Sequence, residues 1–273
     1  MTDYRKINRE VMTDTEWQCK SVPELMEAIQ RSKELQYMVA QEDDISQPKA
    51  ERCDTQFVVS GKRSFEAAKG YPGKKVAVLN FANNHDVGGA PFSAGAQEES
   101  LCRCSTLYPC LQAMWYPFYA KHARLFNAKV INFMGNDDLI YTPGIVVFKT
   151  DERTDPVYPK MMRRDDWYKV DVITCAAPDL RGKFLPKNYE ERITSRIKKI
   201  LDVAAKESVE ALILGAWGCG AFKNPSDVVS RVFAEQLRNY NFEIVEFALA
   251  SNGPLGNSPF TRALTSLTDS TDL

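Results

Sequence analysis

The alternation of short apolar runs with amphipathic segments limits the possible folds of this chain more than any other feature. Beyond residue 55, apolar runs with the length and composition of buried β-strands lie at 56–60, 75–81, 145–148, 170–176, 211–215 and 243–250. Segments with apolar residues at helical spacing lie between several of them, at 64–69, 189–206 and 227–240. Because strands that are apolar on both faces require a helical layer on each side, the pattern predicts an α/β sandwich.

The residues before the first of these strands are expected to be mainly helical. Ser21 and Glu24 have the spacing of a capping box, and Pro23 suits a first helical turn. An apolar stripe at rough helical spacing follows, made of Leu25, Ile29, Tyr37 and Met38. Residues 41–54 are polar and contain a proline, which indicates a loop.

Three regions are therefore expected within one integrated domain. Residues 1–54 form a helical accessory region, and residues 55–250 form the main α/β domain. Residues 251–273 are rich in Ser, Thr, Asn and Asp, so we expect a polar tail with a loosely ordered end.

The charge balance and the cysteines restrict the classes of function. A formal net charge of -1 argues against a protein that holds nucleic acid by bulk attraction. Seven cysteines, several of them in apolar runs, indicate reduced and mostly buried thiols. Cys102, Cys104 and Cys110 lie close together, but the chain has no CxxC pair and only two histidines, His85 and His122. We therefore expect no metal site. The sequence implies no organic cofactor either.

The sequence also lacks the signals of export or membrane insertion. Its first residues, MTDYRKINREVM, contain no apolar core of signal-peptide length. No apolar run approaches the ~20 residues that cross a bilayer. We expect a soluble, cytoplasmic protein that has no membrane partner.

Three segments that each follow a predicted strand carry residues suited to a ligand site, since α/β proteins bind ligands where strands end. The first, residues 80–99, reads NFANNHDVGGAPFSAGAQEE and leads through a glycine-containing loop into a helix. Glycines let a backbone approach an anion closely, and free amides can bind a diphosphate. A plain turn is the alternative reading of the Gly-Gly pair.

The other two segments are shorter. Residues 214–225 read LGAWGCGAFKNP, and this glycine-rich stretch suits a second phosphate-facing loop with Phe222 against a sugar ring. A tight turn with Phe222 in the core is the alternative. Residues 174–180 read TCAAPDL, where a strand breaks at Pro178 and small residues permit close packing of a flat group.

Taken in order, these segments resemble the microbial poly(ADP-ribose) glycohydrolase family, a branch of the macrodomains. The family pattern is a Gly-Gly-Gly loop followed at short spacing by Gln-Glu-Glu. Here Gly88-Gly89-Ala90 is followed, after six residues, by Gln97-Glu98-Glu99. The stretches VLNFANN, LCRCSTLYPCL, LIYTPGIVVFKTDE and VDVITCAAPDLR are also similar to the family. The resemblance implies a three-layer α/β/α macrodomain-like fold with a mixed central sheet.

The resemblance also implies the roles of the matched residues. Glu99 is expected to be the catalytic acid, and Glu98 is expected to help hold the substrate. Asn83 is expected to hydrogen-bond the distal ribose, which Phe222 packs against. The remaining substrate-binding residues implied by the match are Gly88, Gly89, Ala90, Gln97, Gly218, Cys219, Gly220 and Ala221. Ala90 stands where the family has its third glycine, so its Cβ restricts the loop while its amide remains.

Two adjacent acids suit the chemistry of a glycosidic bond. Cleavage of a ribose–ribose bond passes through an oxocarbenium-like state, and the leaving oxygen needs a proton from an acid of raised pKa. Adjacent residues on a helix point about 100° apart, so Glu98 and Glu99 can have different roles. A solvated helix start is the alternative reading of this pair.

The leading hypothesis is a hydrolase that cleaves the O-glycosidic bonds of poly(ADP-ribose) and releases ADP-ribose. The alternatives are removal of single ADP-ribose units from protein or nucleic acid, a non-catalytic ADP-ribose-binding module, and an esterase acting on O-acetyl-ADP-ribose. The partners implied are ADP-ribose, poly(ADP-ribose) and an ADP-ribosylated protein. We expect a surface or structural role for His85, and core packing for the aromatic residues Trp115, Tyr116, Phe118 and Tyr119.

Overall fold

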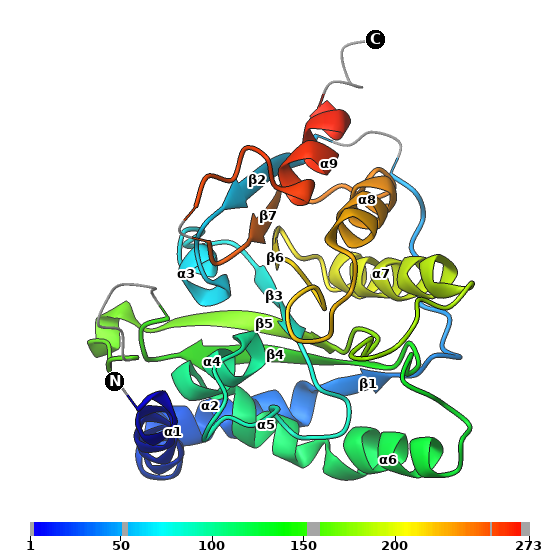
Figure 1. Ribbon diagram of the computed structural model, residues 1–273. Coiled ribbons are helices and arrows are strands. Elements are labelled where there is room, and N and C mark those ends of the chain that lie inside the picture. Colours follow the sequence, from blue (N-terminus) through cyan, green and yellow to red (C-terminus); the bar gives the residue numbers. More distant parts are fainter. Residues whose placement is uncertain (1–2, 51–53, 152–158, 252, 269–273) are drawn as a thin grey trace.

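The computed structural model describes residues 3–50, 54–151, 159–251 and 253–268. Within these ranges, seven strands form one sheet in the order β1-β4-β5-β3-β6-β7-β2 (Figure 1). The strands are β1 (Tyr37–Val39), β2 (Gln56–Ser60), β3 (Val76–Phe81), β4 (Leu139–Val147), β5 (Tyr168–Cys175), β6 (Ala211–Leu214) and β7 (Ile244–Ala248). Because β4 is antiparallel to β1 and β5 while all other pairs are parallel, the sheet is mixed, as predicted.

Each central strand sends alternate side chains into two separate cores. In β3, Ala77 and Leu79 belong to one core, and Val76 and Val78 belong to the other. All four are buried. Successive side chains of a strand point to opposite faces, so this alternation explains why the strands read as continuous apolar runs.

Helices cover both faces of the sheet, which confirms the predicted three-layer arrangement (Figure 1). One layer holds α7 (Tyr189–Lys206), α8 (Ser226–Leu237) and α9 (Pro259–Thr268). The other holds α1 (Tyr4–Ser21), α2 (Pro23–Leu35), α3 (Ser64–Ala68), α4 (Gln97–Cys104) and α5 (Leu107–Ala113). A π-helical turn, η1 (Trp115–Tyr119), leads into α6 (Ala120–Asn127), and a 3-10 turn, η2 (Arg164–Asp166), precedes β5.

The N-terminal region differs from the prediction in two respects. Ser21 is the last residue of α1, and α2 begins at Pro23 without any side-chain cap, so the expected capping box is wrong. Tyr37 and Met38 do not extend the helix but lie in β1, at the edge of the sheet beside β4. The predicted first-turn position of Pro23 is confirmed, because the missing N–H of proline costs nothing there.

The C-terminal region is more ordered than its composition suggests. We expected a polar tail over residues 251–273, but Pro259–Thr268 form α9. Phe260, Leu264 and Leu267 are buried against the core beneath α8 and β7. These three residues have the i, i+4, i+7 spacing of an apolar helical stripe, and this stripe packs α9 against the core. Residues 269–273 lie outside the described part of the chain.

Most of the described cysteines, and two of the four clustered aromatic residues, are buried. The described cysteines are free thiols; all are buried except Cys219, which is half-buried, while Cys53 lies outside the described residues. Phe118 and Tyr119 pack in the core as predicted, but Trp115 and Tyr116 are exposed, so that prediction is wrong for these two. His85 is half-buried with its ring edge-on to Phe126, as expected of a structural role.

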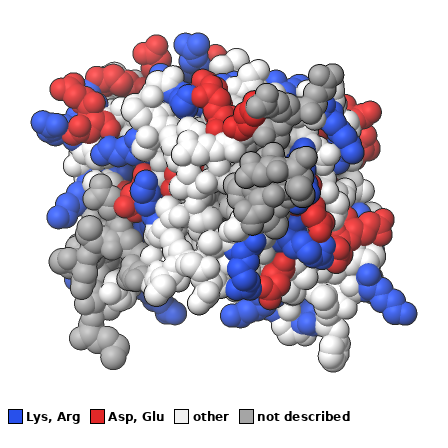
Figure 2. Space-filling model, turned by 90° about the horizontal axis from the view of Figure 1, so that it is seen from above, with Lys and Arg blue, Asp and Glu red and all other residues white. Residues whose placement is uncertain are grey.

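The arrangement of the described side chains and helices bears on metal binding and membrane insertion. No group of three or more His, Cys, Asp or Glu side chains is placed to hold a metal ion in this part of the chain. None of the helices described is both long and apolar enough to span a membrane. On the face seen in Figure 2, blue and red side chains are mixed around an uncharged centre, which agrees with the small net charge.

Candidate active site

The loop from β3 to α4 owes its shape to two glycines. Gly88 and Gly89 have φ values of +65° and +66°, a conformation that side chains with a Cβ rarely adopt. A Cβ added to Gly89 would lie 2.4 Å from Oε1 of Glu99. A Cβ added to Gly88 would lie 2.9 Å from Sγ of Cys102. Both positions therefore require glycine, and the carboxylate of Glu99 rests directly on the loop backbone.

Gly89→Ala should lower kcat about 100-fold, because the new methyl group displaces the carboxylate of Glu99, the expected acid, and a shift of about 1 Å in such a group can cost that much. Gly95→Ala is the matched control. It lies in the same loop, lacks a positive φ and has open space around its Cβ. Steady-state turnover of the expected substrate, poly(ADP-ribose), measures both variants. Equal activities would show that the Gly89 contact does not position the acid.

Glu98 is a buried acid with both oxygens engaged. Oε2 accepts a hydrogen bond from the Asn83 backbone N–H at 2.8 Å, and Oε1 accepts one from Nδ2 of Asn80 at 3.1 Å. Burial raises the pKa of Glu98 to about 8, although these two hydrogen bonds act in the opposite direction. Glu98 is therefore largely protonated at neutral pH and fixes the loop start to the end of β3.

Glu99 differs from its neighbour in having one oxygen without a partner. Its side chain is buried, and Oε1 accepts a hydrogen bond from the Ala90 N–H at 3.2 Å. Oε2 is buried and has no hydrogen-bond partner within the described structure. A buried carboxyl oxygen without a partner is costly unless a ligand engages it.

Ala90 replaces the family's third glycine without strain. Its φ is not positive, and its side chain is exposed. The replacement therefore leaves the loop conformation and the amide that faces Glu99 intact. The expected restriction by its Cβ does not affect this conformation.

The side chains of Gln97 and Asn83 are used mainly within the protein. Gln97 accepts a hydrogen bond from the Phe81 N–H at 2.9 Å and donates to the Leu79 carbonyl at 2.8 Å, which ties α4 to β3. Oδ1 of Asn83 accepts hydrogen bonds from the N–H groups of His85 and Asp86 at 2.8 and 3.1 Å. In this conformation both residues shape the site.

The loop from β6 to α8 also depends on a glycine. Gly218 has a φ of +72°, and a Cβ there would lie 2.4 Å from Cβ of Ala177. The buried Asn224 closes the loop by donating from Nδ2 to the carbonyls of Pro178 and Gly218, at 2.8 and 3.0 Å. Gly220 has open space around it, so its backbone is accessible to a ligand.

Phe222 closes one side of the site together with a cation. Its ring is half-buried: it packs against the core and also lines the cavity, so it combines both of the expected placements. The guanidinium of Arg181 lies 5.3 Å from the ring centre. Arg181 also pairs with Asp179 and remains largely exposed.

The two loops line a shared cavity of about 500 Å³, a size typical of small-molecule sites. The predicted site residues that line it are Asn83, Gly89, Gln97, Glu98, Glu99, Gly218, Gly220, Ala221 and Phe222. Gly88, Ala90 and Cys219 support the loops without lining the cavity. Arg181 and Trp217 line it and were not predicted.

Several supporting residues were also missed. The buried Arg103 donates to the carbonyls of Pro91 and Ala94 at 2.8 and 2.7 Å. Asn8 on α1 donates to the Ala94 carbonyl at 3.1 Å, so the accessory region holds the loop as well. Asn80, which donates to Glu98, is a further supporting residue. It is the one of these that the sequence could have indicated, because it is a polar residue within an apolar strand.

Comparisons with known proteins identify the family of this chain. The family model for the microbial-type PARG catalytic domain matches residues 8–150. No curated protein matches the chain. The poly(ADP-ribose) glycohydrolase of Thermomonospora curvata, bound to the inhibitor ADP-HPD, is 28% identical with a TM-score of 0.78, and the match covers 95% of this chain and 98% of that one.

A second solved structure is similar over nearly the same extent. The poly(ADP-ribose) glycohydrolase of Deinococcus radiodurans in complex with ADP-ribose is 27% identical with a TM-score of 0.70, and the match covers 90% of this chain and 98% of that one. The family model spans more than half of the chain and includes the β3–α4 loop and both acids. The chain therefore belongs to the microbial-type poly(ADP-ribose) glycohydrolase family.

Proposed function

We propose that this protein hydrolyses the ribose–ribose O-glycosidic bond of poly(ADP-ribose) and releases ADP-ribose. The observation that carries the proposal is the buried, unpartnered Oε2 of Glu99 beside a cavity bounded by two glycine-rich loops. The similar structures that hold ADP-ribose or ADP-HPD support a ligand of this class.

The terminal ADP-ribose unit lies between the two loops. Backbone amides near Gly89 and Gly220 face its diphosphate, and Phe222 packs against the distal ribose. Glu98 keeps Asn83 and the loop start in place next to the reacting sugar. These assignments rest on the family resemblance and on the lining of the cavity.

Glu99 supplies the proton that the reaction needs. As the bond between the anomeric carbon and the leaving oxygen breaks, the proton of Glu99 passes to that oxygen. The oxygen of a water molecule then bonds to the anomeric carbon. The proton released by this water returns to the Glu99 carboxylate, so the enzyme is unchanged at the end of the cycle.

The test is to incubate the protein with poly(ADP-ribose) and to follow free ADP-ribose. We expect steady release from chains. A protein carrying single ADP-ribose marks serves as a second substrate, and O-acetyl-ADP-ribose serves as a third. Release only from the single marks, or deacetylation alone, would replace the proposal with the corresponding activity. Tight binding of ADP-ribose without turnover of any substrate would indicate a binding module.

A further inference from the structure

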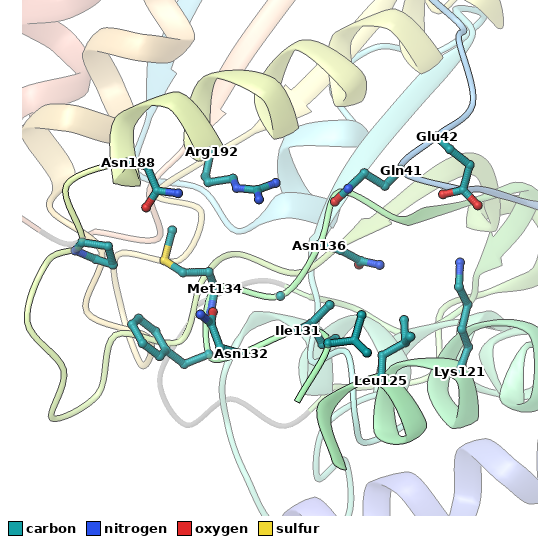
Figure 3. Close-up of a pocket in the computed structure, with 14 residues that line it drawn as sticks. Gln41, Glu42, Lys121, Leu125, Ile131, Asn132, Met134, Asn136, Asn188 and Arg192 are labelled. Carbon is teal, nitrogen blue, oxygen red and sulfur yellow. The ribbon is translucent and has the colours of Figure 1, made fainter. Parts of the chain in front are cut away.

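A second cavity, of about 580 Å³, is drawn in Figure 3. Its walls come from α6, from the loop between α6 and β4, and from the start of α7. Figure 3 labels ten of the residues that line it: Gln41, Glu42, Lys121, Leu125, Ile131, Asn132, Met134, Asn136, Asn188 and Arg192. Its size is comparable to that of the cavity that holds the acids.

The two cavities are direct neighbours. Asn83 lines the first, and Nδ2 of the next residue, Asn84, would lie 3.2 Å from a Cβ on Gly135, which lines the second. The Asp179 N–H donates to the Phe133 carbonyl at 2.9 Å, which joins the wall of the second cavity to the segment that contains Arg181. The walls of the two cavities are therefore in direct contact.

The lining of the second cavity is rich in hydrogen-bond donors. Arg192 is half-buried, extends over the cavity in Figure 3, and has no acceptor or ion-pair partner among the residues described. Oδ1 of Asn132 accepts the Met134 N–H at 2.8 Å, and Oδ1 of Asn136 lies 2.6 Å from Nε2 of His122. Each amide is thus left with its NH₂ group as a donor, a lining that suits an anion.

The cations at the two ends of this cavity are not equivalent. Lys121 is neutralised, since its Nζ lies 2.8 Å from Oδ2 of Asp138. Glu42, the acidic residue of the lining, is near Lys121 and opposite Arg192 (Figure 3). The Arg192 end therefore carries the unbalanced positive charge.

A basic loop with an exposed aromatic ring bridges the two cavities. Residues 181–187 read RGKFLPK and contain no acid. Arg181 lines the first cavity and Pro186 lines the second. Between them, Phe184 is 96% exposed, and Lys183 lies over the ring of Phe133. Basic residues interleaved with an exposed aromatic ring are typical of surfaces that bind nucleotide chains by charge and stacking.

We infer that the second cavity and the 181–187 loop hold the ADP-ribosyl unit on the leaving side of the bond that is cut. This inference rests on the proposed chain-cleaving function. The terminal unit occupies the ends of β3 and β6, and the next unit continues beyond the acids on the side of β5 and β4. Arg192 and the amides of Asn132 and Asn136 bind its diphosphate, and Phe184 stacks on its adenine.

The test compares two substrates that are cut at the same anomeric carbon but have different leaving groups. One is poly(ADP-ribose), and the other is ADP-ribose carrying 4-nitrophenol at the same anomeric carbon, which has no second diphosphate. We expect Arg192→Gln to raise KM for chains about tenfold and to leave the small glycoside unchanged. Phe184→Ala should act in the same direction. Arg31→Gln, an exposed arginine on α2, is the matched control and should change neither.

The salt dependence gives a second readout. Because contacts with phosphate release counterions, KM for chains should rise less steeply with salt in Arg192→Gln than in the native protein. An equal rise of KM on both substrates would mean that Arg192 supports the acid site. An unchanged KM for chains would mean that the second cavity does not bind the next ADP-ribosyl unit. Either result overturns the inference.

The failure of the proposed function can be distinguished from the failure of this inference. If the native protein cleaves neither substrate, the proposed function is wrong. Binding of fluorescent poly(ADP-ribose) to the Glu99→Gln variant, with and without Arg192→Gln, still tests the cavity because it requires no turnover. A weaker affinity of the double variant for chains, with an unchanged affinity for ADP-ribose, supports the inference; equal affinities for chains contradict it.

Discussion

Glu99→Gln should lower kcat on poly(ADP-ribose) about 1,000-fold and change the affinity for ADP-ribose by less than about threefold. General acids contribute about 10²- to 10⁴-fold, and an amide cannot donate the proton in this way. The substitution keeps the shape of the side chain, and the amide oxygen still accepts the hydrogen bond from the Ala90 N–H. Single-turnover release of ADP-ribose gives the rate, and calorimetry gives the affinity.

The control for this variant is Glu27→Gln, an exposed glutamate on α2, which should retain full activity. The purified Glu99→Gln protein must also be checked for native enzyme, because a small contamination would limit how low a rate can be measured. Activity of Glu99→Gln within tenfold of the native protein would show that another group is the acid. Glu98, with its raised pKa, would then be the first candidate.

Glu98→Gln should make the protein more stable at alkaline pH. The pKa of Glu98 is raised from 4.5 to about 8 in the fold, mainly by burial. The folded state therefore binds this proton more tightly than the unfolded state does. The stabilisation is complete below about pH 4.5 and is lost as the pH rises through 8.

The expected difference is large because each unit of pKa shift corresponds to about 1.4 kcal/mol. At pH 9 the native protein holds an ionised Glu98 in a buried site, whereas Glu98→Gln is neutral. We expect the Tm of the variant to exceed that of the native protein by about 5 °C or more at pH 9, at about 2–4 °C per kcal/mol. Near pH 5 the two values should be close.

The site can accommodate the new amide. Oδ1 of the buried Asn80 has no hydrogen-bond partner in the described structure. After the Asn80 amide rotates by 180°, this oxygen accepts from the introduced NH₂ group, while the introduced carbonyl accepts the Asn83 N–H. Thermal melts from pH 5 to pH 9 test the prediction, with Glu27→Gln as control. Parallel declines in the native protein and in Glu98→Gln would show that Glu98 ionises normally.

The sequence predicted best those elements whose apolar pattern repeats over many residues. Helix α7 has the predicted bounds, Tyr189–Lys206, because its apolar residues keep one face over five turns. Strand β1 was missed because three residues at a sheet edge are too short to show a period of two. Helix α9 was missed because its polar composition hid an apolar stripe of three residues.

The site was predictable at its motifs but not at its supports. The acids and the glycines of both loops could be located through the resemblance to the family's motifs, and Gly89, Gly218, Gly220 and both acids line one cavity. The supports act through contacts between distant segments, such as Arg103 to the carbonyl of Pro91 and Asn224 to that of Pro178. A single sequence contains no record of such contacts. For the same reason, the use of Gln97 as a clamp could not be foreseen.

The pairing of β2 with β7 determines when the sheet can be completed during synthesis of the chain. These strands lie side by side, although Gln56 pairs with Ile244, near the opposite end of the chain. Contacts between such distant residues form late, because the long intervening chain must first be closed into a loop. A nascent chain that still lacks β7 leaves β2 unpaired, so the complete sheet is expected to form only after β7 has emerged from the ribosome.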